Sequence, residues 1–185
     1  MTITSIAVFC GSKLGKDPLF AQHTIELGRL IADRNIRLVY GGGKAGLMGL
    51  IADTALAGGA TVLGIIPELL MEWETYHEGI TELRTVANMH VRKKMMYENC
   101  DAAIILPGGF GTLDEFFEVL TWFQLGIHSK PCVLVNTCGY FDGLLQFLDT
   151  AVEQDFVKPE NRALVHQARD SGEALAMLDR LWRQP

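Results

Sequence analysis

The chain has 185 residues, of which 49% are hydrophobic and 21% charged, and its formal net charge is −6 at pH 7. This length and hydrophobicity favour one folded domain over residues 1–185 and exclude an intrinsically disordered chain. The acidic balance, with Lys and Arg scattered along the chain, argues against a nucleic-acid partner, which requires a basic surface.

Membrane, export and metal signals are absent from the sequence. No apolar run reaches the roughly 18 residues that a membrane-spanning helix needs, so we expect no membrane partner. The first residues, MTITSIAVFCGS, lack the basic segment and cleavage site of a signal peptide. The four cysteines form no CxxC pair and have no His at zinc-ligand spacing. We therefore expect free thiols, no metal and a cytoplasmic location.

Short apolar runs rich in Val and Ile alternate with longer helical patterns along the whole chain. The runs predict buried strands at Ser5–Cys10, Arg37–Tyr40, Thr61–Ile66, Ala102–Leu106 and Cys132–Asn136, with weaker candidates at Glu82–Val86 and Ala163–His166. The helical patterns cover Pro18–Asp33 after an Asp17 cap, then Leu47–Ala57, His90–Asn99, Thr112–Leu125, Tyr140–Glu153 and Ser171–Arg183. This alternation predicts an α/β fold: a Rossmann-like, doubly wound parallel sheet with helices on both faces.

The turns between the predicted strands and the helices that follow them are the candidate ligand sites, because such sheets bind ligands beyond the carboxyl ends of their strands. Three turns stand out: Cys10–Ser12, Gly41–Gly49 and Pro107–Thr112. The second has the GxGxxG spacing of NAD(P)-binding folds, and Glu68 lies where an acidic residue would bind a ribose hydroxyl. Tight turns before helices need glycine in any case, and this turn belongs to the second unit rather than the first. An NAD(P)-dependent oxidoreductase is therefore the weaker alternative.

The third turn, PGGFGTLDE, combines three glycines with a helix start. The glycines let the backbone approach a ligand, and the free N–H groups of the helix start favour phosphate. Thr112 and Glu115 have the spacing of a capping box, a reciprocal side-chain cap. Capping explains these two residues but not the glycines, so Glu115 is also a candidate carboxylate for catalysis.

Two flanking segments add to this site. The helix predicted at Thr112–Leu125 is apolar around most of its circumference, which favours burial against a second copy of the chain, a homodimer, over an unusually thick core. Upstream, Arg92, Lys93 and Lys94 lie in the first turns of a helix, where cations oppose the helix dipole. An isolated basic turn is usually solvated, but beside a phosphate site Arg92 has a reason to bind anionic oxygens.

Taken together, PGGFGTLDE (Pro107–Glu115), MHVRK (Met89–Lys93) and YGGGKAGLMG (Tyr40–Gly49) closely resemble the LONELY GUY (LOG) family, over nearly the whole chain. Many members of that family were labelled possible lysine decarboxylases. The resemblance implies a phosphoribohydrolase. Such enzymes cleave the N-glycosidic bond of N6-substituted adenosine 5′-monophosphates, and in some relatives of AMP, to free base and ribose 5-phosphate. It also implies a homodimer acting on a small-molecule nucleoside monophosphate, with no cofactor.

Residue by residue, the resemblance assigns the catalytic pair to Arg92 and Glu115. It assigns substrate binding to residues of the glycine-rich turns and their surroundings: Gly42, Gly43, Met48, Glu74, Lys93, Gly108, Gly109, Phe110, Gly111, Thr112, Leu113, Asp114 and Thr121.

The residue types suit this chemistry. Glycosidic cleavage passes through an oxocarbenium-like centre that a carboxylate stabilises, and the same carboxylate can orient or deprotonate the attacking water. Both roles fall to Glu115, while Arg92 either holds substrate oxygens or supports the departing purine. Lysine decarboxylation with pyridoxal phosphate needs a Schiff-base lysine and cofactor partners, and no such set is recognisable. A non-catalytic nucleotide-binding module is the remaining alternative.

Overall fold

In the part of the chain that the structure describes, seven parallel strands form one sheet at the centre of the fold. The structure, a computed structural model, describes residues 2–71 and 75–183. The strands are β1 (Ser5–Phe9), β2 (Arg37–Tyr40), β3 (Val62–Pro67), β4 (Glu82–Val86), β5 (Ala102–Ile105), β6 (Cys132–Val135) and β7 (His166–Ala168). Their order is β4-β3-β2-β1-β5-β6-β7, and every neighbouring pair is parallel. The doubly wound α/β fold predicted from the sequence is confirmed. Only β7 is displaced, because it begins at His166, where the predicted segment ends.

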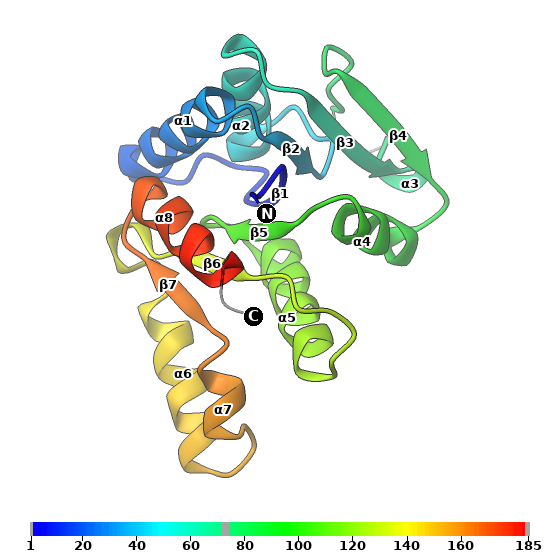
Figure 1. Cartoon of the computed structure of the whole chain (residues 1–185). Helices are drawn as coiled ribbons and strands as arrows, with labels where there is room; N and C mark the ends of the chain where they lie inside the picture. The colour runs from blue at the N-terminus through cyan, green and yellow to red at the C-terminus, as the bar shows by residue number, and fades with distance from the viewer. Residues whose placement is uncertain (1, 72–74, 184–185) are drawn as a thin grey trace.

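Helices cover both faces of the sheet (Figure 1). They are α1 (Pro18–Asp33), α2 (Gly46–Ala57), α3 (Glu68–Met71), α4 (Met89–Glu98), α5 (Phe110–Gln124), α6 (Asp142–Glu153), α7 (Pro159–Arg162) and α8 (Ser171–Trp182), with a 3-10 turn at Thr137–Gly139. The predicted Asp17 cap is confirmed, since its side chain accepts a hydrogen bond from the Leu19 N–H. The four-residue helices α3 and α7 were not predicted, because so short a segment carries no helical periodicity.

Two apolar cores, one on each face of the sheet, explain why the five inner strands are apolar at nearly every position, unlike the edge strands β4 and β7. Ile6 and Val8 of β1 belong to the core under α1, α2 and α8. Ala7 and Phe9 belong to the core under α4 and α5. Because successive strand residues point to opposite faces, a strand covered on both sides is buried throughout.

The strand order reverses between β1 and β5, where ligands bind in folds of this kind. The turns that follow these two strands meet there, and the Gly11 N–H donates a 3.0 Å hydrogen bond to the Pro107 carbonyl. The first and third glycine-rich turns of the sequence are thus brought together by the sheet order.

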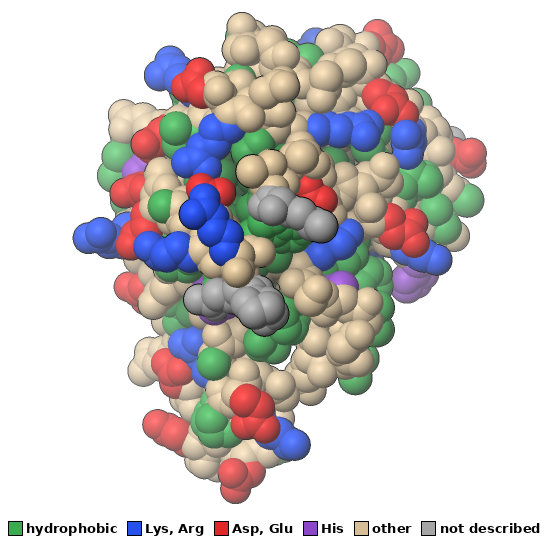
Figure 2. Space-filling model, viewed as in Figure 1, with side chains coloured by type: hydrophobic (Ala, Val, Ile, Leu, Met, Phe, Trp, Pro, Cys, Tyr) green, Lys and Arg blue, Asp and Glu red, His purple; other side chains and the backbone are tan. Residues whose placement is uncertain are grey.

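The visible surface carries charges of both signs, interspersed with apolar side chains (Figure 2). All four cysteines are free thiols, as expected; three are buried and Cys138 is exposed. No helix within residues 2–71 and 75–183 is long and apolar enough to cross a bilayer.

Candidate active site

Helix α5 begins two residues earlier than predicted, at Phe110, and this overturns the predicted capping box. Its N-cap is Gly109, which offers no side-chain hydrogen bond. Thr112 and Glu115 therefore lie inside the helix, and both are buried. The capping box is wrong because a glycine occupies the cap position and the Glu115 carboxylate has another partner. The first N–H groups of α5 are left without a side-chain cap, which favours an anion at this terminus.

The partner of Glu115 is Arg92 of α4. The Arg92 Nη1 atom donates to Glu115 Oε1 at 2.9 Å, and the two side chains are only 9% and 8% exposed. Two carbonyls complete the surroundings of the guanidinium, because Nε donates to Ile65 O at 3.0 Å and Nη2 to Gly41 O at 3.4 Å. Residues from α4, α5, the end of β3 and the turn after β2 thus converge on one ion pair.

Glycines of the second turn serve this packing. A Cβ atom on Gly41 would collide with Arg92 Nη2, so glycine makes room for the guanidinium. A Cβ atom on Gly46, whose φ is +61°, would collide with the backbone of Ser12 in the first turn. Because close packing explains why glycine is needed at both positions, the GxGxxG spacing does not by itself indicate a dinucleotide site.

Burial gives Glu115 an unusual proton affinity. It raises the pKa of the Glu115 carboxyl from an ordinary 4.5 to about 7, although the Arg92 guanidinium acts to lower it. Asp114 adds to the rise and Lys93 opposes it. A carboxyl that titrates near neutral pH can accept and return a proton, as general acid–base catalysis requires.

A cavity of about 260 Å³ opens beside this pair. Its lining residues come from the turns that meet at the strand-order reversal and from the neighbouring helices: Cys10, Gly11, Ser12, Met48, Leu70, Met89, Arg92, Gly109, Phe110, Gly111, Thr112 and Glu115. An adjoining cavity of about 340 Å³ shares Gly11, Ser12 and Gly109 with it and reaches Gly108 and Tyr140. Cβ atoms on Gly109 or Gly111 would meet nothing within 4 Å, so the backbone of the third turn borders open space.

Of the residues that the sequence resemblance assigned to substrate, several lie on the 260 Å³ cavity. Met48, Gly109, Phe110, Gly111 and Thr112 line it together with Arg92 and Glu115. Gly108 lies one residue away, in the adjoining cavity. Glu74 lies outside the described residues.

The remaining assigned residues lie off this cavity. Lys93 Nζ bonds to Asp114 at 3.1 Å and to Glu118 at 3.0 Å, linking α4 to α5. Burial alone lowers the pKa of Lys93, but its bonds to these two carboxylates raise it above its ordinary value. The Thr121 hydroxyl donates to the Phe117 carbonyl at 2.7 Å.

The other three assigned residues have structural contacts. Gly42 accepts a hydrogen bond from the His77 N–H, and Gly43 pairs with Tyr76. Leu113 packs against the core under α5.

Five residues that line the 260 Å³ cavity were not nominated from the sequence. Three of them, Cys10–Ser12, form the first turn, which was singled out as a turn after a strand but not residue by residue. Leu70 belongs to the unpredicted α3, and Met89 begins α4. Burial raises the pKa of the Cys10 thiol, with a further rise from Glu115, so Cys10 is a neutral wall of the cavity.

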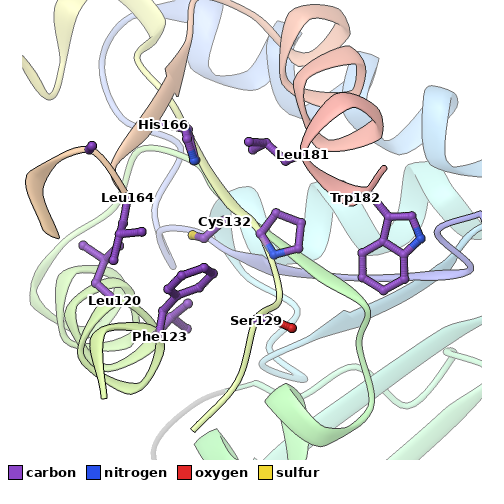
Figure 3. A pocket seen from close by; sticks show the side chains of 11 residues that line it. Leu120, Phe123, Ser129, Cys132, Leu164, His166, Leu181 and Trp182 are labelled. Carbon is purple, nitrogen blue, oxygen red and sulfur yellow. The ribbon is translucent and has the colours of Figure 1, made fainter. Parts of the chain in front are cut away.

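A larger cavity, of about 570 Å³, lies at the amino ends of β6 and β7 (Figure 3). It is bordered by Cys132 and His166, the first residues of β6 and β7, and by Phe123, Leu164 and Trp182. Its described lining includes no Asp, Glu, Lys or Arg. It offers neither the acid–base pair nor the helix start, so the candidate active site remains at the carboxyl ends of β1 and β5.

Known proteins resemble the chain in sequence and in fold. The family model described as "Possible lysine decarboxylase" matches residues 48–178. Cytokinin riboside 5′-monophosphate phosphoribohydrolase LOG7 of Arabidopsis thaliana is 48% identical over 174 residues, which cover 94% of this chain and 80% of LOG7. LOG3 of the same plant is also 48% identical over 174 residues, covering 94% and 81%. The solved Moco carrier protein from Chlamydomonas reinhardtii has a TM-score of 0.71 at 22% identity, with 96% of both chains covered, a likeness of fold alone.

Proposed function

Because the chain belongs to the LOG family of cytokinin riboside 5′-monophosphate phosphoribohydrolases, we propose that it hydrolyses the N-glycosidic bond of N6-substituted adenosine 5′-monophosphates. The products are the free base and ribose 5-phosphate. The observation that carries the proposal is the buried Arg92–Glu115 pair beside a cavity that ends at an uncapped helix start.

In this proposal the 5′-phosphate binds at the start of α5. Gly109 and Gly111 leave the backbone open to a ligand, and the helix dipole favours the anion. Fixing the phosphate there holds the ribose against Glu115, only a turn and a half along the same helix.

Glu115 then acts on the anomeric carbon. In its ionised form it stabilises the oxocarbenium-like centre and takes a proton from the attacking water. The water oxygen bonds to C1′, the C1′–N9 bond breaks, and its electron pair leaves with the purine. The proton held by Glu115 passes to the departing base, which restores the carboxylate. Arg92 orients Glu115 through the 2.9 Å ion pair.

The proposal extends to AMP, because phosphate and ribose contacts are common to both nucleotides. The test is incubation of the purified protein with isopentenyl-AMP, AMP and isopentenyladenosine, followed by chromatography of the released base. We expect base from the nucleotides and far less from the nucleoside, which lacks the phosphate. Binding of both nucleotides without release of base would instead support a non-catalytic nucleotide-binding module.

We propose further that two copies pair across α5 and the turn after it. Phe117, Leu125 and Ile127 are 36%, 65% and 63% exposed there, and exposed apolar groups of this size gather at protein interfaces. The four free thiols favour a reducing compartment such as the cytoplasm.

A further inference from the structure

A short segment between α3 and β4 lies along the second glycine-rich turn. The Lys44 N–H donates to Thr75 O and the His77 N–H to Gly42 O, both at 2.9 Å. Gly43 and Tyr76 form an antiparallel bridge between these two bonds. The turn that follows β2 is therefore paired with a second stretch of backbone.

His77 fastens this segment to α2. Its ring is buried, with 5% of the residue exposed, and both ring nitrogens have partners. Nε2 lies 2.8 Å from Asp53 Oδ1, and Nδ1 accepts a 3.2 Å bond from the Gly79 N–H. Because Nδ1 is an acceptor, the proton of the neutral ring is on Nε2 and points to Asp53.

The turn after β2, which this segment pairs with, also contacts the Arg92 guanidinium. Gly41 O accepts from Arg92 Nη2 at 3.4 Å, and a Cβ atom at Gly41 would collide with that nitrogen. The fit between turn and guanidinium is therefore close, and a shift of the turn moves the surroundings of Arg92. Helix α2, which carries Asp53, also carries the cavity residue Met48.

We propose that His77 and Asp53 are positioning residues for the proposed hydrolysis. They hold the Gly41–Lys44 turn in the place where it supports the Arg92 guanidinium, and so set the geometry of the Arg92–Glu115 pair. The inference rests on the proposed function. Neither side chain lines the 260 Å³ cavity, so both act through the turn rather than on substrate.

Asp53 can be replaced without disturbing the apolar core, so its effect on catalysis can be tested separately from its effect on folding. The Asp53 side chain is 63% exposed, but the His77 side chain is only 7% exposed. Loss of the Asp53 oxygen therefore leaves the buried Nε2–H without its partner, which destabilises the fold. Replacing Asp53 by Ala on a helix surface, by contrast, improves helix propensity. Asp53→Asn, which keeps the accepting oxygen, and the melting temperature of each variant therefore separate an effect on catalysis from a loss of stability.

The experiment compares Asp53→Ala with Asp53→Asn and Tyr40→Phe. The side chain of Asp53→Asn keeps an oxygen that accepts the hydrogen bond from His77 Nε2–H, so this variant should keep the kcat that Asp53→Ala loses. Tyr40→Phe is the matched control, because the buried Tyr40 hydroxyl has no hydrogen-bond partner among the described residues. We expect kcat of Asp53→Ala to fall about tenfold with a small change in KM, since slight misplacement of a positioned group is costly. Asn and the Tyr40 variant should match the wild type.

The pH dependence of activity distinguishes a change in the position of Arg92 from a general loss of stability. Glu115 faces Arg92 and Lys93 from α4, Cys10 from the turn after β1, and Asp114 from its own helix. Loosening Arg92 removes an influence that lowers the pKa of Glu115. The pH at which activity rises should therefore move upward in Asp53→Ala and return in Asp53→Asn. An unchanged kcat and profile in Asp53→Ala would overturn the inference.

Hydrogen exchange tests the inference without relying on activity. The Lys44 and His77 amides should exchange faster in Asp53→Ala than in the wild type or Asp53→Asn. Equal exchange in all three would overturn the inference. A wild type that cleaves no nucleotide would count against the proposed function, while the exchange comparison would still decide whether the pair holds the turn.

Discussion

Replacing Glu115 by Gln removes the ionisable group while keeping its shape. The amide of Glu115→Gln would still offer an oxygen to Arg92 Nη1, and Arg92 keeps its bonds to Ile65 O and Gly41 O. Because burial raises the pKa of the native carboxyl to about 7, its neutral form is accessible near neutral pH, so a neutral amide is not foreign to the site. We expect a loss of only about 1 kcal/mol in the free energy of unfolding, well below the cost of breaking a buried pair outright.

The catalytic effect should be far larger. Loss of a general acid–base group costs about 10²–10⁴ in rate, so we expect kcat on isopentenyl-AMP to fall about a thousandfold. The assay is base release by chromatography, with the melting temperature measured in parallel. One kcal/mol corresponds to about 2–4 °C for a chain of this size. Glu118→Gln is the control, because Glu118 lies on the same helix and pairs with Lys93. A folded Glu115→Gln variant with wild-type kcat would refute the catalytic assignment.

The structure leads to four further predictions. Because activity needs ionised Glu115, kcat/KM should rise with pH up to about 7. Because the pKa of Glu115 in the folded state lies above the ordinary 4.5, the free energy of unfolding of the wild type should fall as pH rises from about 4.5 to 7. Denaturation measured over this pH range should show no such fall for Glu115→Gln. The same fall in both proteins would contradict the raised pKa. Gly41→Ala should lower kcat by displacing Arg92. Gly143→Ala should not, because a Cβ atom on Gly143 meets nothing within 4 Å. Equal kcat values for the two variants would argue against a close contact between Gly41 and the Arg92 guanidinium. Leu125→Asp should yield monomers by light scattering while Phe156→Asp, at an 87% exposed residue, leaves the mass of a dimer; a wild type that is already monomeric would refute the pairing.

The fold was largely readable from the sequence because the sheet is buried on both faces. Among the described residues, six of the seven strands lie within one residue of their predicted bounds at each end. For the five inner strands the reason is a continuous apolar run, whereas the edge strand β4 has a mixed sequence, ELRTV. The short α3 and α7 were not readable, because four residues are held by their neighbours rather than by their own pattern. The family membership expected from the three motifs is confirmed by the relatives.

The sequence identified several residues of the candidate site but did not predict how they pair in the folded chain. Thr112 and Glu115 fit a capping box in sequence, yet Gly109 occupies the cap position and Glu115 turns to Arg92, 23 residues away. The pairing of α4 with α5 is a tertiary contact that local spacing does not encode. The same holds for Lys93, which the resemblance assigned to substrate and which two carboxylates engage in the folded chain.

The most direct measurement is a time course with isopentenyl-AMP in which free base and ribose 5-phosphate are both quantified. We predict that the wild type releases the two products in equal amounts and that Glu115→Gln binds the nucleotide but releases neither. Nucleotide binding by the wild type with no release of base would contradict the proposed hydrolysis.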